Sequence, residues 1–390
     1  MPWKEQTMSE LRMQFVEEVK AGIESKSAIC RRYGISRPTG DKWIHRHEEG
    51  ESMEDRSRRP QHVPCRTEPT MEAAILALRE KHPALGARKI KRILENQGQS
   101  PPGHSTVHAV LKRNGCVSEE ASQAATPYRR FERKAPNELW QSDFKGYFLM
   151  KNGKQCRPLN ILDDHSRYCL KLDAKEDEQL SGTWATFESA FRTYGLPEAI
   201  LCDNGNPWGI NYKQGGYTQF ERMLLDQDIW PKHGRPHHPQ TQGKDERFNQ
   251  TLKRECLRDK TFDDCADVQT HLGPYQRFYN EERPHHALGL EVPASRYRAS
   301  ERAYLETIPD FIYPEGLAVR KVCNGKIKYL GKQFFIGWAF AHTELALRPQ
   351  EDGNEDGVME VLYRNWQVAH IDLRTGKVTR RLRRVTDFRV

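Results

Sequence analysis

The chain has 390 residues, of which 36% are hydrophobic and 30% are charged, and its formal net charge is +8. This length predicts roughly two to four domains, and the polar composition favours small domains joined by solvated connections. The nine cysteines form no CxxC pair, which argues against a disulfide framework and a zinc knuckle, and no apolar run approaches the ~20 residues needed to span a bilayer.

Residues 9–47 predict a helical DNA-binding unit. An apolar face that includes Phe15 and Val16 gives one helix, and "KSAICRRYGISRPTGDKWIHRH" supplies a second helix, a turn and a third. Gly34 suits the left-handed turn, and Ser36 suits the N-cap. A plain three-helix bundle is the alternative interpretation. The side chains expected to face a DNA groove are Arg37, Thr39, Lys42 and Arg46.

Residues 70–115 repeat the helical pattern and predict a second helix-turn-helix. "TMEAAILALREKHP" ends at Pro83, "ARKIKRILENQG" closes at Gly98, and "HSTVHAVLKRNG" stops at Gly115. Two tandem modules would read a longer DNA site than either module alone. The expected DNA contacts of this module are Arg88, Lys89, His104, Thr106 and Lys112.

Basic residues gather in clusters, of which "RSRRP" and "YRRFERK" lie in the linkers around the second module. Several clusters together favour a polyanionic partner, because binding many phosphates at once releases many counterions. An ordinary solvated surface is the alternative for any one cluster. The linker residues expected to contact DNA are Arg58, Arg59, Arg129 and Arg130.

From Leu139 onward, strand patterns alternate with helix patterns. "LWQSDFKGYFL" predicts a strand, "RPLNILDDHSRYCLKL" two strands joined by a turn, and "EAILCDNG" a short buried strand. "SGTWATFESAFRTYG", "YTQFERMLLDQD" and residues 243–256 predict helices. This order predicts a mixed sheet with helices on its faces. Residues 316–382 contain short strands and turns that predict a small β-barrel, followed by a basic tail that is disordered or lies on DNA.

Three acidic residues lie where such a mixed sheet would expose them. Asp143 is inside the first strand, Asp203 ends the strand "AILCD", and Glu246 is near the start of a helix. Each alone has an ordinary interpretation, as a strand-edge residue, a turn former or a helix-dipole partner. Together, three carboxylates without soft ligands would select Mg²⁺ or Mn²⁺, and two such ions activate water or a 3′-hydroxyl for phosphodiester chemistry.

The motifs "LWQSDF", "NILDDHSRYCL", "LCDNG", "HHPQTQGKDERFNQTLK" and "YNEERPHHALGLEVPASRY" occur in this order. They closely resemble the DDE transposases of bacterial insertion sequences, which share the RNase H-like catalytic core of retroviral integrases. The resemblance covers residues 138–299, and the helix-turn-helix front and β-barrel rear are also similar to that family's layout. It implies a multidomain fold with all-α helix-turn-helix modules, an RNase H-like α/β core and a small C-terminal β-barrel.

Carried over by position, the resemblance makes Asp143, Asp203 and Glu246 the catalytic residues and the ligands of Mg²⁺ or Mn²⁺, with two ions expected. It makes Lys253 a DNA contact near the reacting phosphate. Asp245 would point about 100° away from Glu246 on the helix.

One departure from the family pattern is the spacing between Asp203 and Glu246. They are 43 positions apart (246 minus 203), against a usual gap in the mid-thirties, and residues 206–216 are interpreted as a loop insertion. His233, His237 and His238 are expected on a mobile active-site loop, where phosphate contact or no role is favoured over metal ligation.

These observations predict a DNA transposase that binds terminal inverted repeats, cuts at the element ends and joins the 3′ ends to target DNA. We expect double-stranded DNA as partner, a homo-oligomer that is at least a dimer on DNA, no membrane, and a bacterial cytoplasmic, nucleoid-associated location. A DNA-binding regulator or domesticated transposase without strand transfer, and a metal-dependent nuclease, are the alternatives. The expected segments are a first helix-turn-helix domain (1–58), a linker (59–69), a second helix-turn-helix domain (70–117), a basic linker (118–137), the catalytic core (138–305) and a β-barrel domain with basic tail (306–390).

Overall fold

The computed structural model describes residues 7–56, 67–117, 132–205, 207–209, 216–234, 243–350 and 357–385. The chain divides into two compact units, Met1–Arg66 and Thr67–Val390. Among the described residues, none of the helices has both the length and the apolar composition required to cross a membrane.

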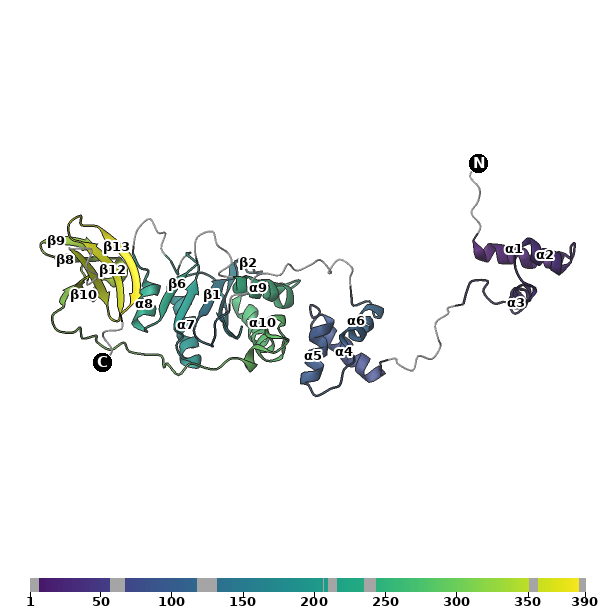
Figure 1. The fold of residues 1–390 in the computed structure, drawn as a ribbon, viewed down its shortest axis with the longest axis horizontal. Coiled ribbons are helices and arrows are strands. Elements are labelled where there is room, and N and C mark those ends of the chain that lie inside the picture. The colour runs from purple at the N-terminus through teal and green to yellow at the C-terminus, as the bar shows by residue number, and fades with distance from the viewer. Residues whose placement is uncertain are drawn as a thin grey trace, which may run out of the picture. The chain divides into compact units, whose positions relative to one another are not determined.

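The first unit consists of helices α1 (Met8–Ala21), α2 (Lys26–Arg32) and α3 (Arg37–Glu48), as Figure 1 shows. Its turn and cap are as predicted, since Gly34 has a φ of 67° and the Ser36 hydroxyl accepts a bond from the backbone of Thr39. Gly40 allows α3 to pack closely, because a Cβ there would lie 2.8 Å from Cys30 Sγ. The buried core is formed by Phe15, Val16, Ile29, Cys30, Trp43 and Met53.

The second unit begins with α4 (Pro69–Lys81), α5 (Ala87–Asn96) and α6 (His104–Arg113). These helices confirm the second helical module predicted from the apolar pattern. They share one buried apolar cluster with the helices of the α/β core, and the ring of His82 stacks on that of Phe278 at 3.9 Å. The second module therefore packs on the core instead of standing alone.

The α/β core is built on a mixed sheet. Its strands are β1 (Trp140–Phe144), β2 (Phe148–Leu149), β3 (Gln155–Asp163), β4 (Cys169–Lys175), β5 (Ala199–Cys202) and β6 (Trp230–His233). The order is β2-β3-β1-β5-β6, and β4 also pairs with β3. The pairs β1–β3 and β3–β4 are antiparallel, whereas β1–β5 and β5–β6 are parallel, which confirms the predicted mixed sheet.

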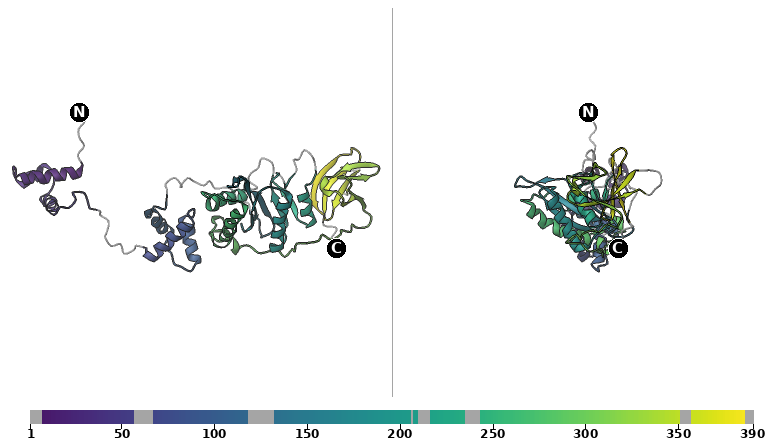
Figure 2. Two further views of the ribbon diagram at one scale, coloured as in Figure 1. Left: turned by 180° about the vertical axis from the view of Figure 1, so that it is seen from behind. Right: turned by 90° about the vertical axis from the view of Figure 1, so that its left-hand side faces the viewer.

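Helices cover both faces of this sheet because neighbouring strand residues point to opposite sides. Ile161 packs in an aromatic-rich cluster with α7, whereas Leu162 packs in the cluster that contains α9 and α10. Figure 2 shows these helices against the teal strands. The helical segments are α7 (Leu180–Tyr194), α8 (Gln219–Asp226), α9 (Gly243–Leu252), the π turn Lys253–Leu257, α10 (Cys265–Arg277), the π turn Phe278–Glu282, and the 3₁₀ turns His286–Leu288, Pro293–Ser295 and Trp338–Phe340.

The C-terminal part is an antiparallel sheet in the order β13-β12-β11-β10-β7, with a separate hairpin of β8 and β9. The predicted β-barrel is not confirmed, since no strand pairing among the described residues joins the edge strands β7 and β13. Arg383 and Arg384, expected in a basic tail, are part of β13 instead. The bounds are β7 (Ala318–Lys321), β8 (Lys326–Tyr329), β9 (Lys332–Phe335), β10 (Glu344–Pro349), β11 (Val358–Tyr363), β12 (Trp366–Asp372) and β13 (Val378–Arg384).

Candidate active site

Asp143 lies near the end of the central strand β1, directly opposite Asn160 of β3. The side-chain amide of Asn160 bonds to the backbone of Asp143, and the side-chain amide of Asn249 bonds to its carboxylate. Asn160 Nδ2 donates to the carbonyl of Asp143 at 3.0 Å and to Asn249 Oδ1 at 3.1 Å, and Asn249 Nδ2 donates to Asp143 Oδ2 at 2.9 Å. Helix α9 is thereby tied to the strand that carries the first acid.

Asp203 follows β5, the strand that runs parallel to β1 on its other side. The backbone nitrogen of Gly205 donates to Asp203 Oδ1 at 2.9 Å, which fixes the carboxylate in a tight turn. A Cβ on Gly205 would lie 3.2 Å from Asp203 Oδ2, so the turn needs a small residue. Trp208 anchors the segment beyond the turn, since it is buried and its carbonyl accepts a bond from Thr218 Oγ1 at 3.0 Å.

Glu246 lies in the first turn of α9 and is exposed. The helix is oriented by its apolar face, on which Phe248 and Leu252 are buried. Asn249 follows Glu246 by almost one turn, so both residues are on the side of α9 that meets Asp143.

The three acids are electrostatic neighbours. Burial, and next the negative charge of Asp203, raise the pKa of Asp143 to about 7, and the charge of Glu246 adds to the rise. A cation that entered this site would relieve the repulsion, and an all-oxygen donor set suits a hard dication such as Mg²⁺ or Mn²⁺. Among the described residues, however, no three acidic, histidine or cysteine side chains already surround a common point. The donor chemistry fits, and binding would draw the carboxylates closer together.

Asp245 is fully buried, whereas its neighbour Glu246 on the same helix is exposed. Neither carboxylate oxygen of Asp245 has a hydrogen-bond partner, and burial raises its pKa well above the ordinary value. Its environment therefore favours a neutral acid. Asp163 and Asp164 have structural roles: Asp163 accepts bonds from the Asn137 and Ser166 backbone, and Asp164 pairs with Lys244 at 2.5 Å.

Lys253 is exposed in the π turn that continues α9. It lies close enough to Lys145 that its charge, after burial, lowers the pKa of Lys145. Two cations therefore stand near the acidic site, on the turn after α9 and just after β1. This arrangement suits phosphate groups on the approach to the carboxylates.

His233 is not on a loop, as the sequence predicted, but is the last residue of β6. Its Nε2 is 2.8 Å from Glu221 Oε1 and its Nδ1 is 2.9 Å from the carbonyl oxygen of Asp203. The ring is therefore engaged by protein groups and is unavailable for phosphate contact. His237, His238 and most of the 206–216 insertion lie outside the described residues.

Most of the predicted DNA contacts that are described lie on accessible surface. Exposed or half-buried side chains belong to Arg37, Thr39, Lys42, Arg88, His104, Thr106 and Lys112. Arg58, Arg59, Arg129 and Arg130 lie outside the described residues.

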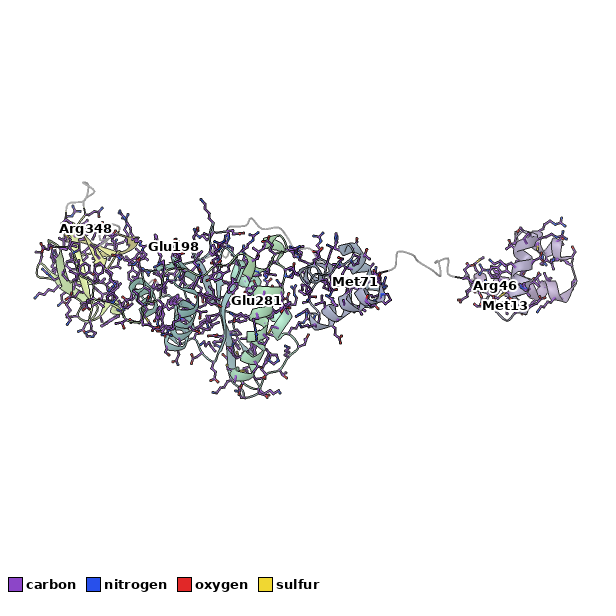
Figure 3. All side chains as sticks on the ribbon, turned by 90° about the horizontal axis from the view of Figure 1, so that it is seen from below. Met13, Arg46, Met71, Glu198, Glu281 and Arg348 are labelled. Atoms are coloured by element: carbon purple, nitrogen blue, oxygen red, sulfur yellow. The ribbon has the colours of Figure 1, made fainter. Side chains whose placement is uncertain are left out.

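Two predicted DNA contacts are corrected by their surroundings. Arg46 is buried in the first unit (Figure 3), where its Nε donates to Glu51 at 3.1 Å and its guanidinium lies over the Trp43 ring. Lys89 packs onto the core, and burial followed by the charge of Arg283 lowers its pKa to about 7. Both side chains are occupied by protein contacts that sequence spacing alone does not indicate.

Other residues near the site were missed by sequence reasoning. Asn160 gave no signal beyond being a polar residue in an otherwise apolar strand. Glu221 resembled an ordinary acid of a capping box, and it does cap α8 through Thr218. Arg380 could have been found from the alternation of Val378, Arg380 and Leu382, which has the period of a strand with one covered face.

Comparison with known families gives several matches along the chain. Two integrase core domain models match residues 133–239 and 227–293. A helix-turn-helix domain matches residues 11–61, and a homeodomain-like domain matches residues 39–111. The C-terminal domain of IS481 family transposases matches residues 317–379.

The chain is also similar to curated proteins of insertion elements. It is 25% identical over 250 residues to an uncharacterized 31.7 kDa protein of IS407 from Burkholderia multivorans, which covers 60% of this chain and 82% of the relative. It is 24% identical over 252 residues to an uncharacterized 39.2 kDa protein of IS476 from Xanthomonas euvesicatoria, covering 62% and 68%. It is 26% identical over 235 residues to the transposase InsD of IS2 from Escherichia coli, covering 55% and 74%.

Solved structures with a similar chain are viral integrases. One is a simian T-cell lymphotropic virus intasome in complex with a PP2A regulatory subunit, with 16% identity, a TM-score of 0.36, and coverage of 81% of this chain and all (100%) of that one. Another is the catalytic core domain of HTLV-2 integrase in complex with magnesium, with 16% identity, a TM-score of 0.31, and coverage of 42% and 97%.

Proposed function

We propose that the chain is a DDE transposase of an insertion sequence, which its similarity to integrase core domains, to the C-terminal domain of IS481 family transposases and to an IS2 transposase supports. In this proposal it binds the terminal inverted repeats of its element, cuts at their ends and joins the 3′ ends to target DNA. In this proposal Asp143, Asp203 and Glu246 are the catalytic residues. The observation that carries it is the electrostatic coupling of these acids, which come from a strand, a turn and a helix far apart in sequence.

The three carboxylates would hold Mg²⁺ or Mn²⁺, with two ions in the full site. Such ions, when bound, activate water or a 3′-hydroxyl and stabilise the leaving oxygen of a phosphodiester. The protein's own groups do the positioning. Asn249 and Asn160 hold Asp143 in place, the Gly205 backbone orients Asp203, and burial of Asp143 keeps bulk water from weakening its interactions.

DNA would be bound by surfaces outside the acidic site. Arg37 and Lys42 of the first module and His104 and Lys112 of the second are exposed on helices of helix-turn-helix units. Lys253 would bind the DNA backbone close to the reacting phosphate. Since both ends of an element must react together, the active form would be at least a dimer on DNA.

A DNA-joining assay with the full-length protein tests this function. Duplexes from the DNA that flanks the coding sequence serve as element ends, a supercoiled plasmid serves as target, and Mg²⁺ is added. We expect joined products from the wild-type protein, and none from Asp143→Asn or Glu246→Gln, which should still bind the end duplex. Asp259→Asn, a change at an exposed acid in a distant turn, is the control and should leave joining unchanged.

The products separate the alternatives. Joining that persists in Asp143→Asn would overturn the catalytic assignment. Nicked DNA without joined DNA would indicate a nuclease, and binding without cleavage would indicate a DNA-binding regulator.

A further inference from the structure

Glu221 of α8 is a buried carboxylate that connects three parts of the second unit. Its side chain is only 1% exposed. One oxygen, Oε2, completes the cap of α8 by accepting the backbone N–H of Thr218 at 2.7 Å. The other, Oε1, is shared by His233 of β6 and Arg380 of β13. Burying a charged carboxylate costs desolvation free energy, which only well-placed partners such as these can offset.

His233 carries the connection from Glu221 to the turn that holds Asp203. It is paired with Cys202, the last residue of β5, across the parallel strands β5 and β6. Its Nδ1 is 2.9 Å from the carbonyl oxygen of Asp203, while its Nε2 is 2.8 Å from Glu221. Each ring nitrogen therefore faces one acceptor oxygen, and the imidazole bridges Glu221 and Asp203. A second contact joins the same two segments: Asn204, which follows Asp203, donates from Nδ2 to the carbonyl of Gly234, which follows His233, at 3.1 Å.

Arg380 enters this network from the C-terminal sheet, whose strand β13 lies beside α8 (Figure 1). Its guanidinium contacts Glu221, donates to the Gly216 carbonyl at 3.0 Å and lies 4.0 Å over the ring of Tyr217. Burial alone would raise the pKa of Glu221, but the His233 bond and the Arg380 charge hold it below the ordinary value. The carboxylate is therefore ionised and attracts both partners at neutral pH.

We propose that Arg380, Glu221 and His233 are positioning residues through which the C-terminal sheet fixes Asp203 in the active site. This inference rests on the proposed catalytic role of Asp203. With the sheet docked, Arg380 holds Glu221, Glu221 holds the imidazole, and the imidazole holds the Asp203 carbonyl. The C-terminal domain thereby contributes to the geometry of the acidic site without supplying a group that touches the reacting atoms.

Arg384 supplies a matched control on the same strand. It pairs with Asp228, beyond the end of α8, and so joins the C-terminal sheet to the core without contacting Glu221 or His233. If β13 only fastens two domains together, the loss of Arg380 and the loss of Arg384 should have similar consequences. If the network positions Asp203, only Arg380 should affect the turn.

Hydrogen–deuterium exchange on the full-length protein without DNA or metal measures the turn directly. In Arg380→Gln, the amides of residues 203–205 should exchange at least about tenfold faster than in wild type, whereas Arg384→Gln should leave them within about twofold. Arg380→Lys keeps a positive charge beside Glu221 and should restore most of the protection. Equal exchange of residues 203–205 in Arg380→Gln and Arg384→Gln would overturn the proposal.

His233→Gln separates positioning from docking, in case Arg380→Gln loosens the whole C-terminal sheet. The glutamine amide can still reach Glu221 but not the Asp203 carbonyl. Exchange should therefore rise at residues 203–205 and stay at the wild-type level in β12 and β13. Unchanged exchange at residues 203–205 in this variant would also overturn the proposal.

Mg²⁺ dependence of DNA cleavage gives a second measure that a merely structural role would not move. Arg380→Gln should need about tenfold more Mg²⁺ for half-maximal cleavage, as expected when support of a metal ligand is lost, with unchanged KM for DNA. Arg384→Gln should keep the wild-type requirement, and an equal increase in both variants would contradict the positioning role. Because exchange needs no catalysis, absence of cleavage in the wild type would contradict the proposed function while the exchange result still decides the positioning role.

Discussion

Asp143 depends on two asparagines for its orientation. Asn249 donates to the carboxylate, and Asn160 supports both Asn249 and the backbone of Asp143. Amide donors of this kind favour the ionised acid and set the direction of its lone pairs. Asp245 differs, since that acid is fully buried yet neither of its carboxylate oxygens has a hydrogen-bond partner. The two acids therefore differ in their hydrogen-bond partners, although burial raises the pKa of both.

We predict that Asn249→Ala lowers the rate of DNA cleavage by about 10–100-fold, because Asp143 loses its side-chain donor. Binding of an end duplex should remain within about twofold, since Asn249 is not among the DNA-contacting groups. Single-turnover cleavage and a gel-shift titration measure the two effects. Gln250→Ala, at an exposed position of the same helix, is the control. Equal rates for the two variants would show that the amide does not support Asp143.

Sequence reasoning reached the three acids but not their supports. Asp143, Asp203 and Glu246 stood out because of their motifs and their places at strand and helix ends. Asn160, Glu221 and Arg380 are ordinary in their local sequence, and they matter only because distant elements meet. Arg46 and Lys89 were assigned to DNA because each lies on a basic helix. The sequence does not show that other parts of the protein cover these side chains in the fold.

Two π turns extend α9 and α10, and a buried ion pair joins them. Arg283, which follows the second turn, contacts Glu255 of the first through two bonds of 2.6 and 2.8 Å, and both side chains are 5% exposed. Burial alone would raise the pKa of Glu255, but the bonds from Arg283 hold it below the ordinary value of 4.5. The pair fixes the end of the helix that carries Glu246 and Asn249.

We predict that Arg283→Met destabilises the second unit by about 3–5 kcal/mol, because it leaves Glu255 buried without its main partner. Arg192→Met, which breaks an exposed pair with Glu306, should change stability far less, because solvent screens that pair. Chemical unfolding of both variants and wild type measures the difference. Costs of similar size for the two substitutions would refute the special role of the buried pair.

The pH dependence of this pair follows from the lowered pKa of Glu255. An acid with a depressed pKa in the folded state stabilises above its unfolded pKa and loses that contribution as pH falls through the folded value. The stability gap between wild type and Arg283→Met should therefore be largest near pH 7. It should shrink as pH falls toward and below the ordinary value of 4.5, because burial without Arg283 raises the pKa of Glu255 in the variant and protonation relieves its penalty. A gap that persists unchanged at pH 3 would contradict the electrostatic origin.

At the level of elements, the spacing of apolar residues and the positions of turn residues predicted most of the helices and strands. The helices of both N-terminal modules and the strands β1, β3, β4 and β5 occur where apolar spacing and turn residues placed them. The C-terminal barrel is the exception, because short alternating strands fit an open sheet as well as a closed one. Closure depends on pairing between the first and last strands, for which the pattern holds no signal.

In the whole molecule, the second helix-turn-helix module is docked on the core through apolar side chains and Lys89. The lowered pKa of Lys89, caused by burial and then by Arg283, means that docking disfavours the protonated amine. The penalty is complete below pH about 7 and disappears as pH rises toward the ordinary value of 10.5.

We predict that Lys89→Met stabilises the second unit at pH 7 by on the order of 1–2 kcal/mol, because an apolar side chain fills the site without losing hydration of a charge. The gain should diminish between pH 8 and pH 10, because the free energy needed to deprotonate the amine on docking falls as pH approaches the ordinary pKa of 10.5. Calorimetry across this pH range provides the measurement. Lys112→Met, at an exposed position of α6, should change stability little at any pH, and a destabilised Lys89→Met would show that the amine is not buried against the core.

The account as a whole depends on Asp143, Asp203 and Glu246 acting as one cation site, and titration of the full-length protein with Mn²⁺, followed by electron paramagnetic resonance of the free ion, tests this most directly. Asp143→Asn, Asp203→Asn and Glu246→Gln should each weaken Mn²⁺ binding by at least about tenfold. Asp245→Asn, which replaces a buried acid whose pKa is raised well above the ordinary value, should bind Mn²⁺ as the wild type does. Wild-type affinity in the three variants, or a loss confined to Asp245→Asn, would contradict the account.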